Sequence, residues 1–309
     1  MDYALAATQV LNGLQLGVLL FLLSAGLTLV FGIMNFVNLT HGSLYMMGAY
    51  FAAAAFKMSD SFLLAVVVAV IGTLVLGLLL DRIVLAGLYK RDHLDQVLAT
   101  FGLILVFNEI VRIIWGSGPV YINAPEFLGG TVSLFGFPYP SYRFAVIAAG
   151  LVVGVLLYLL ISKTRVGMLI RAGAADAEMV SALGSNITLL NTLVFGVGAA
   201  LAGLAGYLWG AQTGYINPEL MGFHMSAHGI MMVILGGMGN FAGAMVGAFA
   251  FEYLLHVFKD LPNIGAFATG KHWQLWMGLF IVLLVVFAPR GLLGLLEKFT
   301  AKKTGAKHA

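Results

Sequence analysis

The sequence predicts an all-helical, polytopic membrane protein, a transmembrane bundle of eight or nine segments of which two are broken or re-entrant. Mean hydropathy is +0.99, 61% of the 309 residues are hydrophobic and only 9% are charged, a composition typical of membrane proteins rather than soluble domains. The 39 glycines suit closely packed transmembrane helices. No polar stretch is long enough for a soluble module, so residues 1–309 are expected to form one integral-membrane domain.

Seven stretches are long and apolar enough to cross a bilayer, since one crossing takes about 20 residues. They are residues 11–33, 61–80, 97–115, 144–161, 189–212, 241–258 and 273–287. The residues before the first stretch lack the basic start and cleavage site of a signal peptide, so this stretch is expected to remain as a transmembrane helix.

Two further stretches are less regular. Residues 35–56 open with the polar run NFVNLTHG, and residues 223–238 are short for a crossing and lead into GGMGN. Both patterns are typical of broken or partly re-entrant helices, which membranes tolerate only where freed backbone groups face protein or a water-filled cavity. We therefore expect a solute pathway near them.

The dipeptide His-Gly occurs once in each irregular stretch, at 41–42 and 228–229, and another glycine follows six or seven residues later. If all nine stretches cross, these two cross in opposite directions, each after a glycine-rich span. An inverted repeat has this arrangement, and it places the pathway near the middle of the bilayer. The alternative is a chance recurrence of His-Gly in a glycine-rich chain.

With nine crossings, eleven of the 16 Lys and Arg residues fall on one face. The positive-inside rule makes that face cytoplasmic, with the N-terminus outside and the basic tail, residues 297–309, inside. An eight-crossing alternative would reverse part of this map. The net charge of +3 follows largely from this asymmetry and requires no nucleic-acid partner.

Catalytic and cofactor motifs are weak. Residues 265–272, GAFATGKH, imitate a phosphate-binding loop, but His272 replaces the required hydroxyl residue and no strand precedes the run. No metal motif ties the histidines to Glu252, and the chain has no cysteine. No acid lies near the middle of a clear span, which counts against a proton-driven carrier. We predict no metal site and no cofactor bound by this chain.

The charged island at residues 163–188, KTRVGMLIRAGAADAEMVSALGSNIT, must sit in water. On a helical wheel one face is apolar and the other polar. The apolar face carries Leu169, Ala172, Met179, Val180 and Leu183; the polar face carries Arg171, Glu178 and Ser181. Asp176 falls within the apolar stripe, where it either caps a shorter helix over 177–183 or meets a basic group of a partner. Gly184 is a natural helix stop, and the segment is expected to dock in a protein groove.

These residues carry a resemblance to a known family. Residues 164–187, TRVGMLIRAGAADAEMVSALGSNI, resemble the cytoplasmic coupling segment of the permeases of branched-chain amino acid ABC importers. Residues 34–45 (MNFVNLTHGSLY), 233–247 (VILGGMGNFAGAMVG) and 288–294 (APRGLLG) are similar to further motifs of that family. The motifs extend over nearly the whole chain, in the order and length expected of the shorter of its two permease subunits.

The resemblance implies a non-enzymatic import subunit of the bacterial inner membrane. It would pair with a second, homologous permease and with two cytoplasmic ABC ATPases, which bind the ATP and magnesium. An extracytoplasmic binding protein would deliver the solute, a branched-chain amino acid or a related small polar or carboxylate compound. The chain departs from the family pattern at Ala175, Ser185 and Leu39-Thr40. The first two departures put the ATPase contact in doubt, and the third the pathway.

Two sets of candidate residues follow. The ATPase-coupling set is Arg165, Gly167, Arg171, Ala172, Asp176, Met179, Leu183, Gly184 and Asn186. The pathway set is Asn35, Asn38, Thr40, His41, Tyr45 and His228. Two other classes stay open: a stand-alone secondary carrier or channel, which would transport without ATP, and a membrane-embedded enzyme, which would need an acid/base or metal cluster.

Overall fold

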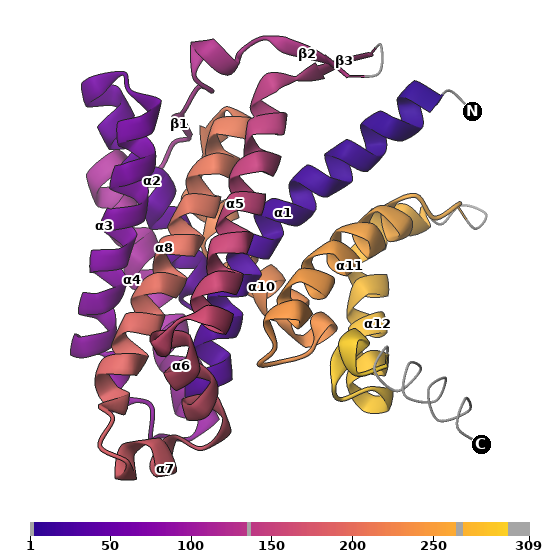
Figure 1. Ribbon diagram of the computed structural model, residues 1–309. Helices are drawn as coiled ribbons and strands as arrows, with labels where there is room; N and C mark the ends of the chain where they lie inside the picture. Colours follow the sequence, from indigo (N-terminus) through magenta and orange to yellow (C-terminus); the bar gives the residue numbers. More distant parts are fainter. Residues whose placement is uncertain (1–2, 135–136, 264–267, 296–309) are drawn as a thin grey trace.

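The computed structural model describes residues 3–134, 137–263 and 268–295. Within these ranges the chain is almost entirely helical (Figure 1). Seven helices are long and apolar enough to cross a membrane, which makes the chain a multi-pass membrane protein and confirms the seven regular spans. These helices are α1 (Tyr3–Met34), α3 (Phe62–Ile83), α4 (His93–Trp115), α5 (Ser141–Lys163), α8 (Ile187–Thr213), α11 (Phe241–Lys259) and α12 (Trp273–Phe287).

The two irregular stretches contain the shorter helices α2 (His41–Ser59) and α10 (Phe223–Gly236). Neither helix is broken internally. The breaks precede them: residues 35–40 are not helical, and the short helix α9 (Pro218–Met221) comes just before α10. In the first stretch the irregular backbone lies at residues 35–40, as predicted. In the second stretch it lies on either side of α10 and not within that helix.

Helices α1 and α8 form the centre of the bundle. In each, most of the apolar span is buried, 78% and 67%, whereas α4 and α5 bury only 22% and leave their leucines and valines outside for lipid. The two central helices cross at Gly26 and Gly198. A Cβ added to either glycine would lie within 2.9 Å of the carbonyl oxygen of the other, so only glycine allows this close approach. Helix α3 packs along α8, and α11 packs along α1.

The two ends of the bundle differ. At one end lie two short antiparallel strand pairs, which the sequence analysis did not predict: β1 (Val120–Tyr121) with β4 (Tyr215–Ile216), and β2 (Thr131–Leu134) with β3 (Phe137–Pro140). The opposite end carries α6 (Arg165–Ala175) and α7 (Ala177–Ala182) (Figure 1). Single 3-10 turns also occur: η1 (Leu85–Gly87), η2 (Glu126–Leu128) and η3 (Thr269–His272). Residues 291–295, the last described ones, are helical. The predicted basic tail, residues 297–309, lies outside the described residues.

Candidate functional site

The break between α1 and α2 is held by one local hydrogen bond and by two hydrogen bonds to α4. Asn38 Oδ1 accepts from the backbone N–H of Thr40 at 3.0 Å, and Thr40 Oγ1 donates to the carbonyl of Thr100 at 3.1 Å. One turn earlier on α4, Gln96 Oε1 accepts from the N–H of Val37 at 3.3 Å. These bonds satisfy backbone and side-chain groups that no helix satisfies, which is the condition for irregular backbone inside a membrane protein.

Helices α2 and α10 begin at the same place, and Ser226 joins them. The backbone N–H of Gly42 donates to Ser226 Oγ at 2.8 Å, and Ser226 Oγ donates to the carbonyl of Leu39. A Cβ on Gly42 would lie 2.5 Å from the backbone nitrogen of Ser226, so this position requires glycine. We call this contact between the two helix starts the helix junction; it comprises Asn38–Gly42 and Gly222–Ser226.

His41 fastens the junction to the central helix α1. Its Nε2 donates to the carbonyl of Leu23 at 3.0 Å, and its ring lies against Gly26, beside the crossing with Gly198. The side chain is buried, with 1% of its surface exposed. His41 therefore serves to position α2.

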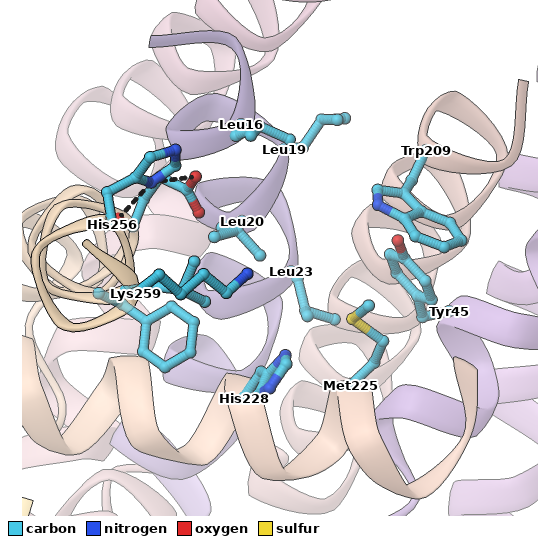
Figure 2. A pocket seen from close by; sticks show the side chains of 13 residues that line it. Leu16, Leu19, Leu20, Leu23, Tyr45, Trp209, Met225, His228, His256 and Lys259 are labelled. Carbon is cyan, nitrogen blue, oxygen red and sulfur yellow. Dashed lines mark hydrogen bonds and ion pairs between the residues drawn. The ribbon is translucent and has the colours of Figure 1, made fainter. Parts of the chain in front are cut away.

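A cavity of about 350 Å³ lies beside the junction, between α1, α2, α8, α10 and α11. This volume falls within the range of small-molecule sites. One wall is apolar and consists of Leu16, Leu19, Leu20 and Leu23 of α1 (Figure 2). Tyr45 and Trp209 lie on another side, Met225 and His228 come from α10, and α11 contributes Phe251, Glu252, Leu255, His256 and Lys259. We call this space the polar cavity.

The charged residues that line the polar cavity, Glu252 and Lys259, both belong to α11. Glu252 Oε1 lies 3.2 Å from His256 Nδ1, an ion pair when the histidine is protonated. Lys259 Nζ stands over the ring of Trp273, 5.3 Å from its centroid. The ring of His228 packs against Phe251, with 5.2 Å between centroids. Charged and imidazole groups thus face the leucine wall of α1 across the cavity.

A second cavity, of about 400 Å³, lies on the other side of the junction and is almost wholly apolar. Its lining is Leu27, Phe31, Val37, Asn38, His93, Ile230, Val233, Ile234 and Met238. Both cavities border the same two helices, α1 and α10, and Leu23 of the polar cavity is one helical turn from Leu27 of this apolar cavity. The two spaces therefore follow one another along the seam between α1 and α10.

The predicted pathway residues separate into three groups. Tyr45 and His228 line the polar cavity, and Asn38 lines the apolar cavity. Thr40 and His41 are buried in the helix junction. Asn35 is exposed just after α1, with a positive φ of 47° that bends the chain back into the bundle.

The charged island folds as two helices, α6 and α7, whose starts are capped by their own side chains. Thr164 Oγ1 accepts from the N–H of Gly167 at 3.0 Å, and Asp176 Oδ1 accepts from the N–H of Met179 at 2.9 Å. Of the two readings of Asp176, the cap is confirmed. The single apolar stripe is wrong, because the chain turns at Asp176 and leaves its carboxylate exposed. Gly184, with φ +88°, follows the end of α7 as predicted.

Local contacts fix the rest of this segment. Asn186 caps α8 by accepting from the N–H of Leu189 at 2.9 Å, and Arg171 donates to the carbonyl of Ile161 at the end of α5. A Cβ on Gly167 would overlap that same carbonyl. Ala172 is half-buried and Arg165 is exposed.

Apolar side chains of α6 and α7 nevertheless remain uncovered. Met168 is 56% exposed, Met179 58% and Leu183 79%, whereas Val180 is buried. No contact within the described chain requires these exposed side chains to be apolar. They form a surface suited to a protein partner.

Comparison with known proteins decides the family. The model of the family described as "Branched-chain amino acid transport system / permease component" matches residues 9–289, nearly the entire chain. The chain belongs to this permease family. The family consists of transport subunits and not of enzymes.

Relatives of the permease align over most of their length. BraD of Pseudomonas aeruginosa, a high-affinity branched-chain amino acid transport system permease protein, is 29% identical over 306 residues, which cover 93% of this chain and 95% of BraD. LivH of Escherichia coli is 29% identical over 298 residues, covering 93% and 94%. LivM of Escherichia coli is 27% identical over 307 residues, covering 92% and 70%. No solved structure matches the chain significantly.

Sequence reasoning overlooked several residues that organise the permease. Ser226 is an ordinary serine in a helical run, and only the folded chain brings it to Gly42. Trp209 is one apolar residue among many in α8. Glu252 was considered only as part of a metal motif, and Lys259 was not singled out. Along α11, Glu252, His256 and Lys259 are spaced four and then three residues apart. This spacing places the three side chains on one helix face and is the signal that could have found them.

Proposed function

We propose that this permease carries branched-chain amino acids, or a related small polar or carboxylate solute, into the bacterial cytoplasm. The observation that carries the proposal is the family match over residues 9–289, together with relatives named for high-affinity branched-chain amino acid transport. The two cavities along α1 and α10 support it, because they provide space for a small solute on both sides of the helix junction.

The proposed topology has nine crossings, with α2 and α10 each completing one together with the irregular backbone before it. The N-terminus lies outside, and α6, α7 and the C-terminal tail lie in the cytoplasm. An inverted repeat of α1–α3 and α8–α11 agrees with three features. The helices α2 and α10 start at one junction, Gly26 and Gly198 make a reciprocal contact, and α3 packs along α8 as α11 packs along α1.

The solute would pass along the seam between α1 and α10. Tyr45 and His228 would contact it in the polar cavity, and Asn38 in the apolar cavity. Thr40 and His41 would act by holding the broken backbone in place, and Asn35 would lie at the cytoplasmic end of the seam. Both cavities are bounded by the α1–α10 pair, so a small shift of α10 would close one and widen the other.

The remaining subunits are a second homologous permease, two cytoplasmic ABC ATPases that bind ATP and magnesium, and an extracytoplasmic binding protein. The match of this chain to both LivH and LivM of one organism supports a pair of related permeases. The exposed Arg165, Met179 and Leu183 would contact the ATPase. The other six coupling residues would give α6 and α7 their shape: Gly167, Arg171, Ala172, Asp176, Gly184 and Asn186.

Reconstitution in liposomes tests this function. Co-expressed with its second permease and ATPases, and supplied with the binding protein, the permease should take up L-leucine only when ATP is present. The matched control is the same complex with an ATPase variant that binds but does not hydrolyse ATP. Uptake by the isolated chain without ATP would instead establish a stand-alone carrier or channel.

A further inference from the structure

The charged wall of the polar cavity is unusual for its position. Glu252 lies within the membrane-spanning helix α11, and Lys259 closes that helix. Ionisable side chains in a transmembrane segment are costly and generally belong to a solute pathway or to an internal pair. Only half of this set is paired: Glu252 lies 3.2 Å from His256, whereas Lys259 has no carboxylate within ion-pair distance among the residues that the structure describes.

Lys259 is nevertheless held in place. Its Nζ stands 5.3 Å from the centroid of the Trp273 ring, and the same ring lies 6.3 Å from that of His228. A lysine over an aromatic face keeps its charge and its three donors. The amino group is therefore positioned at the cavity next to an imidazole, and an additional anion would complete its coordination.

We propose that the polar cavity is a solute-binding site of the permease itself that recognises amino acids as zwitterions. Lys259 and His228 bind the carboxylate, Glu252 binds the ammonium group, and the leucine wall of α1 receives the aliphatic side chain (Figure 2). This inference rests on the proposed function and deepens it, because it places specificity on this chain in addition to the binding protein.

Three properties of the cavity support an amino acid over other small solutes. The charges of both signs come from a single helix, α11, so a ligand with adjacent opposite charges can contact Glu252 and Lys259 together, whereas a singly charged ligand contacts only one of them. The opposite wall consists of four leucines, which favours an aliphatic side chain over a polar one. The volume of about 350 Å³ suits one small solute.

Binding to the complete importer, without ATP and without the binding protein, tests the site. The probes are L-leucine, 3-methylbutylamine, which lacks the carboxylate, and 4-methylpentanoate, which lacks the amino group. Calorimetry and tryptophan fluorescence report binding, since Trp209 lines the cavity and Trp273 contacts Lys259. The wild-type complex should bind L-leucine at least about tenfold more tightly than either analogue, because each analogue loses its charge-assisted hydrogen bonds to one side of the site.

The variants should each remove one preference. The Lys259→Met complex should bind L-leucine no more tightly than 3-methylbutylamine. The Glu252→Gln complex should bind L-leucine no more tightly than 4-methylpentanoate. Lys259→Arg keeps the charge and should keep the preference, which distinguishes lost recognition from lost folding. The controls Lys57→Met and Glu109→Gln change exposed charges elsewhere in the bundle and should behave as wild type.

The outcomes separate this inference from the proposed function. If the wild-type importer takes up L-leucine with ATP but Lys259→Met and Glu252→Gln retain the wild-type preference, the site is wrong and the function stands. If the preference and its loss are observed but no uptake depends on ATP, the site stands and the import function is wrong. Absence of any L-leucine binding to a wild-type complex that imports it also overturns the site.

Discussion

The helix junction and the segment of α6 and α7 satisfy their backbone polar groups in different ways. At the junction, the bonds of Ser226 join residues 184 and 187 positions apart in the sequence. In α6 and α7, the capping bonds of Thr164 and Asp176 join residues only three positions apart. The junction thus depends on contacts between distant parts of the chain, whereas α6 and α7 are capped by neighbouring residues.

The difference follows from the surroundings. The junction is buried within the bundle, where water cannot replace a lost hydrogen bond, so every freed group needs a protein partner. The ends of α6 and α7 are exposed, so water can satisfy the backbone N–H and C=O groups that the caps do not. A substitution at the junction should therefore destabilise the fold, whereas one on α6 or α7 should affect the proposed contact with an ATPase.

The largest expected effect is that of Ser226→Ala. It leaves the N–H of Gly42 and the carbonyl of Leu39 without their shared partner, a loss of about 2 kcal/mol in the free energy of unfolding. Thermal unfolding of the purified complex, followed by tryptophan fluorescence, measures it, and L-leucine uptake should fall with the fraction folded. Ser43→Ala is the matched control, since that buried hydroxyl has no hydrogen-bond partner among the described residues. Equal effects of the two variants would show that Ser226 does not join the helices.

The same contrast explains what the sequence could predict. The regular spans follow from apolar runs, and the cap at Asp176 and the stop at Gly184 follow from neighbouring residues. The strand pairs and the bond between Gly42 and Ser226 depend on contacts between distant parts of the chain, which no local pattern encodes. The single apolar stripe failed because a helical wheel assumes one continuous helix, and the cap at Asp176 starts a new one.

A smaller effect is expected at Asp176. Asp176→Ala removes the cap of α7 and costs about 1 kcal/mol locally. A six-residue helix depends on such contacts, so solute-stimulated ATP hydrolysis by the complex should fall several-fold while the unfolding temperature hardly changes. Asp176→Asn retains the acceptor oxygen and should stay near wild type. If Asn impairs hydrolysis as much as Ala does, the carboxylate charge meets a basic group of the ATPase, and the cap is not its main role.

The smallest effect on stability, with a specific effect on assembly, is expected for Leu183→Asn. Its side chain is 79% exposed, so the free energy of unfolding should change by less than about 0.5 kcal/mol. If an ATPase covers this side chain, the substitution removes about 1.5 to 3 kcal/mol of apolar burial, and co-purification of the ATPase should decrease about tenfold or more. Met58 is 89% exposed and lies near the end of α2, and Met58→Asn should leave co-purification of the ATPase unchanged. Unchanged co-purification of Leu183→Asn would mean that the exposed apolar surface of α6 and α7 is not where the ATPase binds, and that the coupling residues act through the shape of the segment alone.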